Sequence, residues 1–264
     1  YIDSLRCAME TPCPNYEKLG VEVAGEYRQL NANILQIENE YYSTIRPKQI
    51  MDAFEKPIHA LKRRGVRYVE LRSIDVNAYD PLGINERQLR FLEAFLVFCQ
   101  LHESPVISAL ERKEIDHNEL ATAHRGRDPR LVLQRNGKKV KLKDWAMEIL
   151  DNMTGVCDLL DEGRAQKPYG ESLAVQIDKV KDPERTPSAR MLAEMRARDE
   201  GFFHFAMRMS QQHQTYFQEL APDAARTAEF THLAEQSWVQ QRKLEAANDE
   251  PFSDYLQRYF AQPV

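Results

Sequence analysis

The sequence lacks a long hydrophobic run and lacks an excess of basic residues. Its longest apolar stretch lies around Phe95 to Cys99, far short of the 20 or so residues that span a bilayer. No signal-peptide pattern opens it, so we expect no membrane partner. The formal net charge is −5, and no basic stripe alternates with aromatic residues. These absences argue against a nucleic-acid-binding function as well.

Cysteine is also scarce, with four residues in 264 and no Cys-x-x-Cys pair. No Cys/His spacing suits zinc. Cys99 and Cys157 fall on apolar faces of predicted helices, where a thiol usually packs as a small buried hydrophobe. We therefore expect a protein of the reducing cytoplasm, without structural disulfides.

The length of 264 residues suits one large domain or two small ones. The sequence begins with Tyr1 and runs directly into the charged amphipathic segment Tyr1-Ile-Asp-Ser-Leu-Arg6. We expect a piece of a longer protein. A mature chain left after processing is the alternative.

The chain divides into two parts with different predicted structures, and together they predict an α+β fold. Residues 1–143 mix strands and helices, whereas residues 144–264 are almost wholly helical and are expected to pack on the first part. The predicted helices cover residues 1–9, 58–64, 144–160, 188–220 and 223–247, with two more after Asn85 and after Pro251. The predicted strands cover residues 21–23, 27–42, 67–75, 131–134 and 139–142, with Asn136-Gly137 as the best hairpin turn.

The predicted strand 67–75 carries a pair of charged residues with possible chemistry. Side chains alternate between the two faces of a strand, so Val69 and Leu71 point one way and Glu70 and Arg72 the other. A carboxylate suits Mg²⁺, and the planar guanidinium suits phosphate oxygens. An ordinary surface ion pair is the alternative interpretation.

Residues 31–48 contain a second group of polar side chains. If this segment is a strand, Glu38, Glu40 and Tyr42 share one face, and Arg46 and Lys48 come directly after them. Polar residues this dense in a strand are costly unless they are paired or used. A polar edge strand is the alternative, although it does not explain the repeated Asn, Gln and Glu residues.

These motifs closely resemble signatures of the proteobacterial-type glutamate–cysteine ligases. The resemblance is carried by Asn31-x-Asn-x-Leu-Gln-Ile-Glu-Asn-Glu-x-Tyr-x-x-Ile-Arg-Pro-Lys48 and by Tyr68-Val-Glu-Leu-Arg-Ser-Ile-Asp75, with Asn77 and Pro81-Leu-Gly83 after it. The opening Tyr1-Ile-Asp-Ser-Leu-Arg6 and the closing Ala247-Asn-Asp-Glu-Pro-Phe252 match as well. The match is dense to about residue 104 and thin from there to about residue 240.

The resemblance implies a fold, a reaction and a missing partner. The fold would be part of a glutamine-synthetase-like antiparallel catalytic sheet with packed helices, followed by the helical region. The reaction would join the γ-carboxylate of L-glutamate to the amine of L-cysteine through a γ-glutamyl phosphate, with ATP and Mg²⁺ or Mn²⁺, as the first step of glutathione synthesis. Because members of the family are about twice as long, the amino-terminal half is missing here, and the chain by itself is expected to be inactive. The intact enzyme is expected to be a monomer.

The resemblance also implies roles for five residues. Glu70 would be a metal ligand, and Arg72 would be the catalytic residue that contacts the transferring phosphate and the tetrahedral intermediate. Tyr42 would help to form the cysteine pocket, and Arg46 and Glu40 would line the substrate site. Two other functions stay open: another carboxylate–amine ligase of the glutamine synthetase superfamily, and a non-catalytic helical interaction protein.

Overall fold

The computed structural model describes residues 1–247 and 250–262, and these residues form two compact units. Unit 1 joins Tyr1–Asp75 to Pro222–Val264, and unit 2 is Val76–Ala221. The predicted boundary after residue 143 lies inside unit 2, and the division into residues 1–143 and 144–264 stays a prediction. In the closing motif, Asn248 and Asp249 lie outside the described residues.

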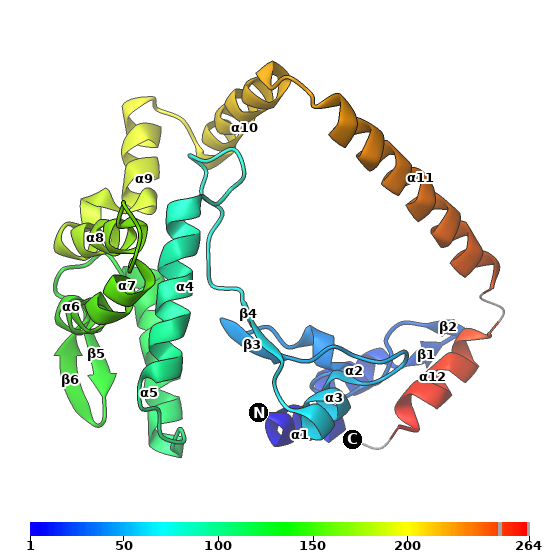
Figure 1. Cartoon of the computed structure of the whole chain (residues 1–264). Coiled ribbons are helices and arrows are strands. Elements are labelled where there is room, and N and C mark those ends of the chain that lie inside the picture. The colour runs from blue at the N-terminus through cyan, green and yellow to red at the C-terminus, as the bar shows by residue number, and fades with distance from the viewer. Residues whose placement is uncertain (248–249, 263–264) are drawn as a thin grey trace. The chain divides into compact units, whose positions relative to one another are not determined.

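Unit 1 contains short strands and helices from both ends of the chain (Figure 1). Its elements are α1 (Ile2–Glu10), α2 (Pro14–Leu19), β1 (Glu22–Val23), β2 (Glu26–Tyr27), η1 (Glu38–Glu40), β3 (Ile45–Lys48), α3 (Pro57–Arg64), β4 (Tyr68–Leu71), α11 (Ala224–Ala246) and α12 (Phe252–Phe260). Its buried apolar side chains include Leu5 of α1, Ile58 and Leu61 of α3, and Leu256 of α12. The last helix of the chain therefore belongs to the same unit as the first.

The antiparallel pair β3–β4 holds two of the five predicted site residues, Arg46 and Glu70. Arg46 lies opposite Glu70, and Lys48 lies opposite Tyr68. Directly paired residues of an antiparallel ladder present their side chains on the same face. The alternation along β4 therefore places Arg46, Lys48, Tyr68 and Glu70 on one polar face, while Val69 lies on the other and is exposed.

The prediction of a strand continuing from residue 27 to residue 42 was wrong. β2 ends at Tyr27, and the segment after it is a loop that ends in the 3₁₀ helix η1. The amide side chains that made the segment unusual hold this loop: Leu30 N donates to Gln36 Oε1 at 2.6 Å, and Asn31 Nδ2 donates to the Gln36 carbonyl at 3.0 Å. Asn and Gln side chains that bond to nearby backbone compete with a strand ladder.

Unit 2 is mainly helical, with one hairpin. Its elements are α4 (Glu86–Leu101), α5 (Ala109–Arg125), β5 (Val132–Arg135), β6 (Lys138–Lys141), α6 (Leu142–Asn152), α7 (Thr154–Leu160), α8 (Pro168–Lys181), η2 (Pro183–Arg185), α9 (Pro187–Ala197) and α10 (Phe202–Glu219). The main core packs α4, α6, α7 and α8 around Met153, Cys157 and Leu173, and Leu133 of the hairpin packs near α5. With its small antiparallel sheets, the chain is the α+β protein that the sequence predicted.

Several local predictions for unit 2 were confirmed, and others were wrong. Asn85 caps α4 in a capping box, and Asn136-Gly137 turns the β5–β6 hairpin. The single helix predicted for 144–160 is divided at Met153, and the one predicted for 188–220 is broken near Asp199, which has a positive φ of 52°. The sequence patterns did not predict α2, α5 or α8. Cys157 is buried as predicted, but Cys99 is exposed.

Within the part of the chain that the structure describes, no helix is both long enough and apolar enough to cross a lipid bilayer.

Candidate functional site

Glu70 and Arg72 lie side by side, as the period of the strand predicted. Arg72 Nη2 donates to Glu70 Oε1 at 3.1 Å, and Lys48 Nζ lies 3.4 Å from Glu70 Oε2. The hydrogen bond from Arg72 is the main cause that lowers the pKa of Glu70, and the charge of Lys48 adds to it. The carboxylate is therefore ionised at neutral pH and is shared between two cations.

Tyr42 lies beside Arg72 although the segment between them is not a continuous strand. The Arg72 guanidinium carbon lies 4.9 Å from the centre of the Tyr42 ring, within the range of a cation–π contact. The Arg72 backbone N–H donates to the Thr44 carbonyl at 2.9 Å, which ties the end of β4 to the segment that follows Tyr42. The Tyr42 side chain is otherwise open, with 75% of the residue exposed.

Arg46 is buried beneath this group, with 3% of its surface exposed. Its Nη2 donates to the Glu38 backbone carbonyl at 3.3 Å. Its Nε has no hydrogen-bond partner among the described residues. A buried donor left without an acceptor costs about 1–3 kcal/mol.

Glu38, which the sequence analysis did not place in the site, is still more buried, at 1% exposed. Tyr259 of α12 donates its hydroxyl to Glu38 Oε2 at 3.3 Å, and Oε1 finds no partner in the described parts of the chain. Burial first, and then the Glu38 charge, raises the pKa of the Tyr259 hydroxyl, which therefore stays protonated as a donor. The nearby Lys56 is also buried: burial lowers its pKa, and the Glu38 charge opposes this change.

A cavity of about 270 Å³ joins most of these side chains. Arg46, Lys48 and Arg72 line it with Glu38, so cations outnumber anions on its wall. The other lining residues are apolar or uncharged: Tyr1, Leu5, Asn39, Tyr42, Pro47, Gln49, Met51, Pro57, Ile58, Leu61 and Tyr68. Three of the five predicted site residues, Tyr42, Arg46 and Arg72, thus line one cavity. Glu70 does not line it but pairs with its lining residues Lys48 and Arg72, and Glu40 does not line it either. Glu40 is exposed and accepts a hydrogen bond from Gln36 N at 2.7 Å.

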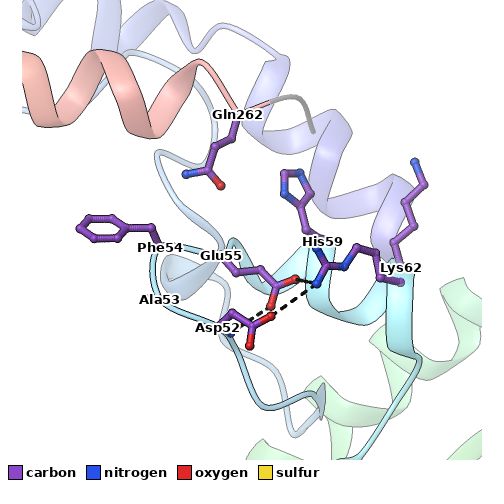
Figure 2. A pocket seen from close by; sticks show the side chains of 8 residues that line it. Asp52, Ala53, Phe54, Glu55, His59, Lys62 and Gln262 are labelled. Carbon is purple, nitrogen blue, oxygen red and sulfur yellow. Dashed lines mark hydrogen bonds and ion pairs between the residues drawn. The ribbon is translucent and has the colours of Figure 1, made fainter.

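A larger cavity of about 500 Å³ is lined by residues of α3, by the loop before it and by Gln262, and by none of the predicted site residues. Figure 2 shows its acidic side chains, Asp52 and Glu55, joined to arginine by dashed interactions. Arg63 Nη2 lies 3.4 Å from Asp52 Oδ2 and 3.1 Å from Glu55 Oε1, and Arg64 also pairs with both carboxylates. Arginine side chains already pair with both carboxylates. The wall of this cavity therefore has fewer polar groups without a partner than the wall of the smaller cavity.

The described residues do not form a metal site by themselves. No group of three or more His, Cys, Asp or Glu side chains within residues 1–247 and 250–262 could hold a metal ion. Glu70 supplies one carboxylate, and that carboxylate is already paired with Arg72 and Lys48. The proposed Mg²⁺ or Mn²⁺ would need further ligands from residues outside this set.

Glu38, Lys56 and Tyr68 lie near the site although no sequence pattern predicted it. Glu38 and Tyr68 belong to the two motifs, but a regular strand over residues 27–42 gave no reason to expect a buried Glu38. Lys56 and Tyr259 are 203 positions apart and meet only because α12 packs near α3, where Lys56 Nζ lies 5.1 Å from the Tyr259 ring centre. No periodicity within one segment could have found this contact.

Comparison with known proteins identifies the chain's relatives. The family model for glutamate-cysteine ligase matches residues 1–122. The glutamate–cysteine ligase of Pseudomonas paraeruginosa strain PA7 is 46% identical over 261 residues, which cover 99% of this chain and 49% of the relative. The corresponding protein of Janthinobacterium sp. strain Marseille is 42% identical over 259 residues, covering 98% and 49%.

A solved structure extends this likeness to three dimensions. The glutamate–cysteine ligase of Francisella tularensis, in complex with AMP, matches with a TM-score of 0.89 and 33% identity, over 99% of this chain and 52% of that one. The chain spans about half the length of the relatives it matches. Together with the matching sheet motifs, these comparisons place the chain in the glutamate–cysteine ligase family, as a homologue that corresponds to about half of a full enzyme.

Proposed function

We propose that the chain supplies part of the catalytic site for ATP-dependent ligation of the L-glutamate γ-carboxylate to the L-cysteine amine, in the cytoplasm. The observation that carries this proposal is that Arg46, Arg72 and Tyr42 line the same cavity, whose wall has more cations than anions. A carboxylate is a poor electrophile, and its phosphorylation by ATP gives the amine a γ-glutamyl phosphate to attack. Each step builds negative charge on oxygen, which fixed cations stabilise.

Arg72 is proposed to hold the transferring phosphate and the tetrahedral intermediate. Its guanidinium is oriented by Glu70 on one side and by the Tyr42 ring on the other. Tyr42 is proposed to form part of the cysteine pocket, with Arg46 and Glu40 lining the substrate site. The AMP bound to the Francisella relative supports a nucleotide co-substrate for this chain.

Glu70 is proposed to become a metal ligand only together with carboxylates from the other half of the enzyme. Its pairing with Arg72 and Lys48 keeps the carboxylate ionised, as a Mg²⁺ or Mn²⁺ ligand must be.

The missing half is proposed to be a partner of this chain, and the exposed area supports that proposal. A folded monomer of this mass exposes about 12,000 Å², and two separate domains of half the mass expose about 14,000 Å² together. This chain exposes 19190 Å². The excess area suits a large interface, and exposed side chains such as Val69 and Ile45 on the apolar face of β3–β4 would be covered there.

Reconstitution tests the proposal. This chain is produced together with the half of the Pseudomonas paraeruginosa relative that it does not match, and product is measured with ATP, Mg²⁺, L-glutamate and L-cysteine. We expect γ-glutamylcysteine and ADP in equal amounts. ADP formation with other amines but not with L-cysteine would indicate another ligase of the glutamine synthetase superfamily.

A non-catalytic helical interaction protein is the second candidate. α11 buries no residue within its described range and exposes Phe230, Leu233, Trp238 and Leu244. Exposed apolar side chains in this number are typical of a segment that binds another protein. A stable complex with the other half that forms no ADP with any amine would favour this function.

A further inference from the structure

The last helix of the chain, α12, packs on segments of unit 1 that come far earlier in the sequence. The ring centre of Phe252 lies 5.2 Å from that of Tyr27, and the ring centre of Tyr255 lies 6.3 Å from that of Phe54. Both separations are typical of aromatic pairs that stabilise a fold. Leu256 of the same helix is buried. Apolar contacts therefore fix α12 on unit 1.

Two buried charged residues hold the end of α12. Lys56 is 3% exposed, and its Nζ donates to the Gln262 carbonyl at 3.1 Å and lies 5.1 Å from the centre of the Tyr259 ring. The Tyr259 hydroxyl donates to Glu38 Oε2 at 3.3 Å. A hydrogen bond to a charged group contributes more to stability than one between neutral groups, so this bond ties α12 firmly to η1.

Glu38 connects α12 to the candidate site. Its backbone carbonyl accepts a hydrogen bond from Arg46 Nη2 at 3.3 Å and another from Tyr41 N at 3.2 Å, which closes the 3₁₀ turn η1. Arg46 lines the 270 Å³ cavity, whereas Tyr259 does not. Tyr259 can therefore influence the wall of this cavity through Glu38 without touching what the cavity holds.

We propose that Tyr259 is a positioning residue: its hydroxyl holds the Glu38 carboxylate and so fixes η1, and the Glu38 carbonyl in turn fixes the Arg46 guanidinium on the cavity wall. The inference rests on the proposed function for the reaction in which Arg46 takes part. Such positioning matters because a displacement of about 1 Å at a reacting centre can lower a rate by about 10²-fold. Neither Tyr259 nor Glu38 is assigned a contact with substrate.

Tyr259→Phe tests the inference in the reconstituted enzyme, because it removes the hydroxyl and keeps the ring. We expect it to raise the KM for L-glutamate or L-cysteine about tenfold and to change kcat less, since Arg46 is proposed to line the substrate site. Tyr255→Phe removes a hydroxyl from the same helix and is the matched control, which should keep wild-type constants. Wild-type constants for Tyr259→Phe as well would overturn the inference.

A double-mutant cycle separates action through Glu38 from a merely structural effect. Glu38→Met removes the acceptor and keeps a side chain of similar length, and circular dichroism checks that each variant folds. If Tyr259 acts through Glu38, the addition of Tyr259→Phe to Glu38→Met raises the KM no further. The same tenfold factor in both backgrounds would show that Tyr259 acts by another route, and that result would contradict the inference.

Amide hydrogen exchange of the full chain tests the same link without catalysis. Glu40 N and Tyr41 N donate to the carbonyls of Ile37 and Glu38 within η1. We expect Tyr259→Phe to speed exchange at these two amides about tenfold, while the amides of α4 in unit 2 keep their wild-type rates. Unchanged exchange at η1, or equal acceleration in η1 and α4, would overturn the inference.

These measurements distinguish the inference from the proposed function. If the reconstituted enzyme makes γ-glutamylcysteine and Tyr259→Phe behaves as wild type in it, the inference fails and the proposed function stands. If the enzyme makes no product with any amine, the proposed function fails, and hydrogen exchange decides the inference: faster exchange confined to η1 supports the link from Tyr259 to η1, and unchanged exchange refutes it.

Discussion

Arg72 is held between an anion and an aromatic ring, and both contacts limit its motion. Glu70 accepts its hydrogen bond at 3.1 Å, and the Tyr42 ring centre lies 4.9 Å from its guanidinium carbon. A guanidinium fixed in this way can meet a developing charge with little reorganisation, which is the main advantage of a preorganised site. The ion pair seen here is thus compatible with a catalytic role for Arg72.

Substitution of Arg72 gives the most direct test at the residue scale. In the reconstituted enzyme we expect Arg72→Ala to lower kcat by about 10²-fold or more, the size of effect seen when a key charge stabiliser is lost. Arg72→Lys keeps the charge but not the planar fork, so we expect an intermediate rate. A steady-state assay measures both, and an unchanged kcat for Arg72→Ala would remove Arg72 from the mechanism.

Glu55 gives a second prediction, about stability in acid. The hydrogen bond from Arg64, at 2.6 Å, is the main cause that lowers the pKa of Glu55 from 4.5 to about 2. A carboxyl whose folded pKa is depressed stabilises the fold above pH 4.5, and this contribution is lost as the pH falls from 4.5 towards 2. We expect Glu55→Gln to flatten the decline of Tm in that window.

Thermal unfolding between pH 6 and pH 2.5, followed by circular dichroism, measures this effect. Glu17→Gln, at an exposed position on α2, is the control that should keep the wild-type slope. The same slope for Glu55→Gln and for wild type would show that the ion pairs with Arg63 and Arg64 do not stabilise the fold.

At the scale of elements, the start of α4 is determined by a few adjacent residues. Gln88 N donates to Asn85 Oδ1 at 2.9 Å, and Asn85 N donates to Gln88 Oε1 at 3.2 Å. This reciprocal pair satisfies backbone groups that the first turn of a helix leaves unpaired. Local chemistry of this kind can be predicted from sequence, as can the Asn136-Gly137 turn.

Removal of the Asn85 cap should weaken unit 2. We expect Asn85→Ala to lower the free energy of unfolding by about 1 kcal/mol, because the Gln88 N–H loses its acceptor. Urea denaturation followed by circular dichroism measures the change. Asn85→Ser keeps a capping oxygen and should recover most of the loss, whereas equal losses for both variants would argue against the cap.

At the same scale, prediction failed where side chains compete with the backbone ladder. Residues 31–42 have the alternation of a strand, yet their amide side chains bond to their own loop, and Glu38 is buried in a 3₁₀ turn. Because periodicity assumes regular backbone, it placed Glu38, Glu40 and Tyr42 together. The structure instead separates exposed Glu40 from buried Glu38.

At the scale of the whole molecule, the exposed area of 19190 Å² is the dominant feature. Apolar side chains on β3, β4 and α11 remain uncovered. We expect the isolated chain to bind a hydrophobic dye such as ANS and to aggregate, because large exposed apolar surfaces promote association. Addition of the other half of the enzyme should lower dye fluorescence and give a one-to-one complex in light scattering. A monomeric chain that binds no dye would contradict this expectation.

The sequence by itself determined the family of this protein, the α+β class, the helix cap, the hairpin turn and the pairing of Glu70 with Arg72, because each of these depends on residues that are close along the chain. Only the tertiary structure decided that Arg46 and Glu38 are buried on one cavity and that Tyr259, from the last helix, holds Glu38. The physical reason is that burial and long-range contact depend on how distant segments pack, which no local pattern of residues specifies.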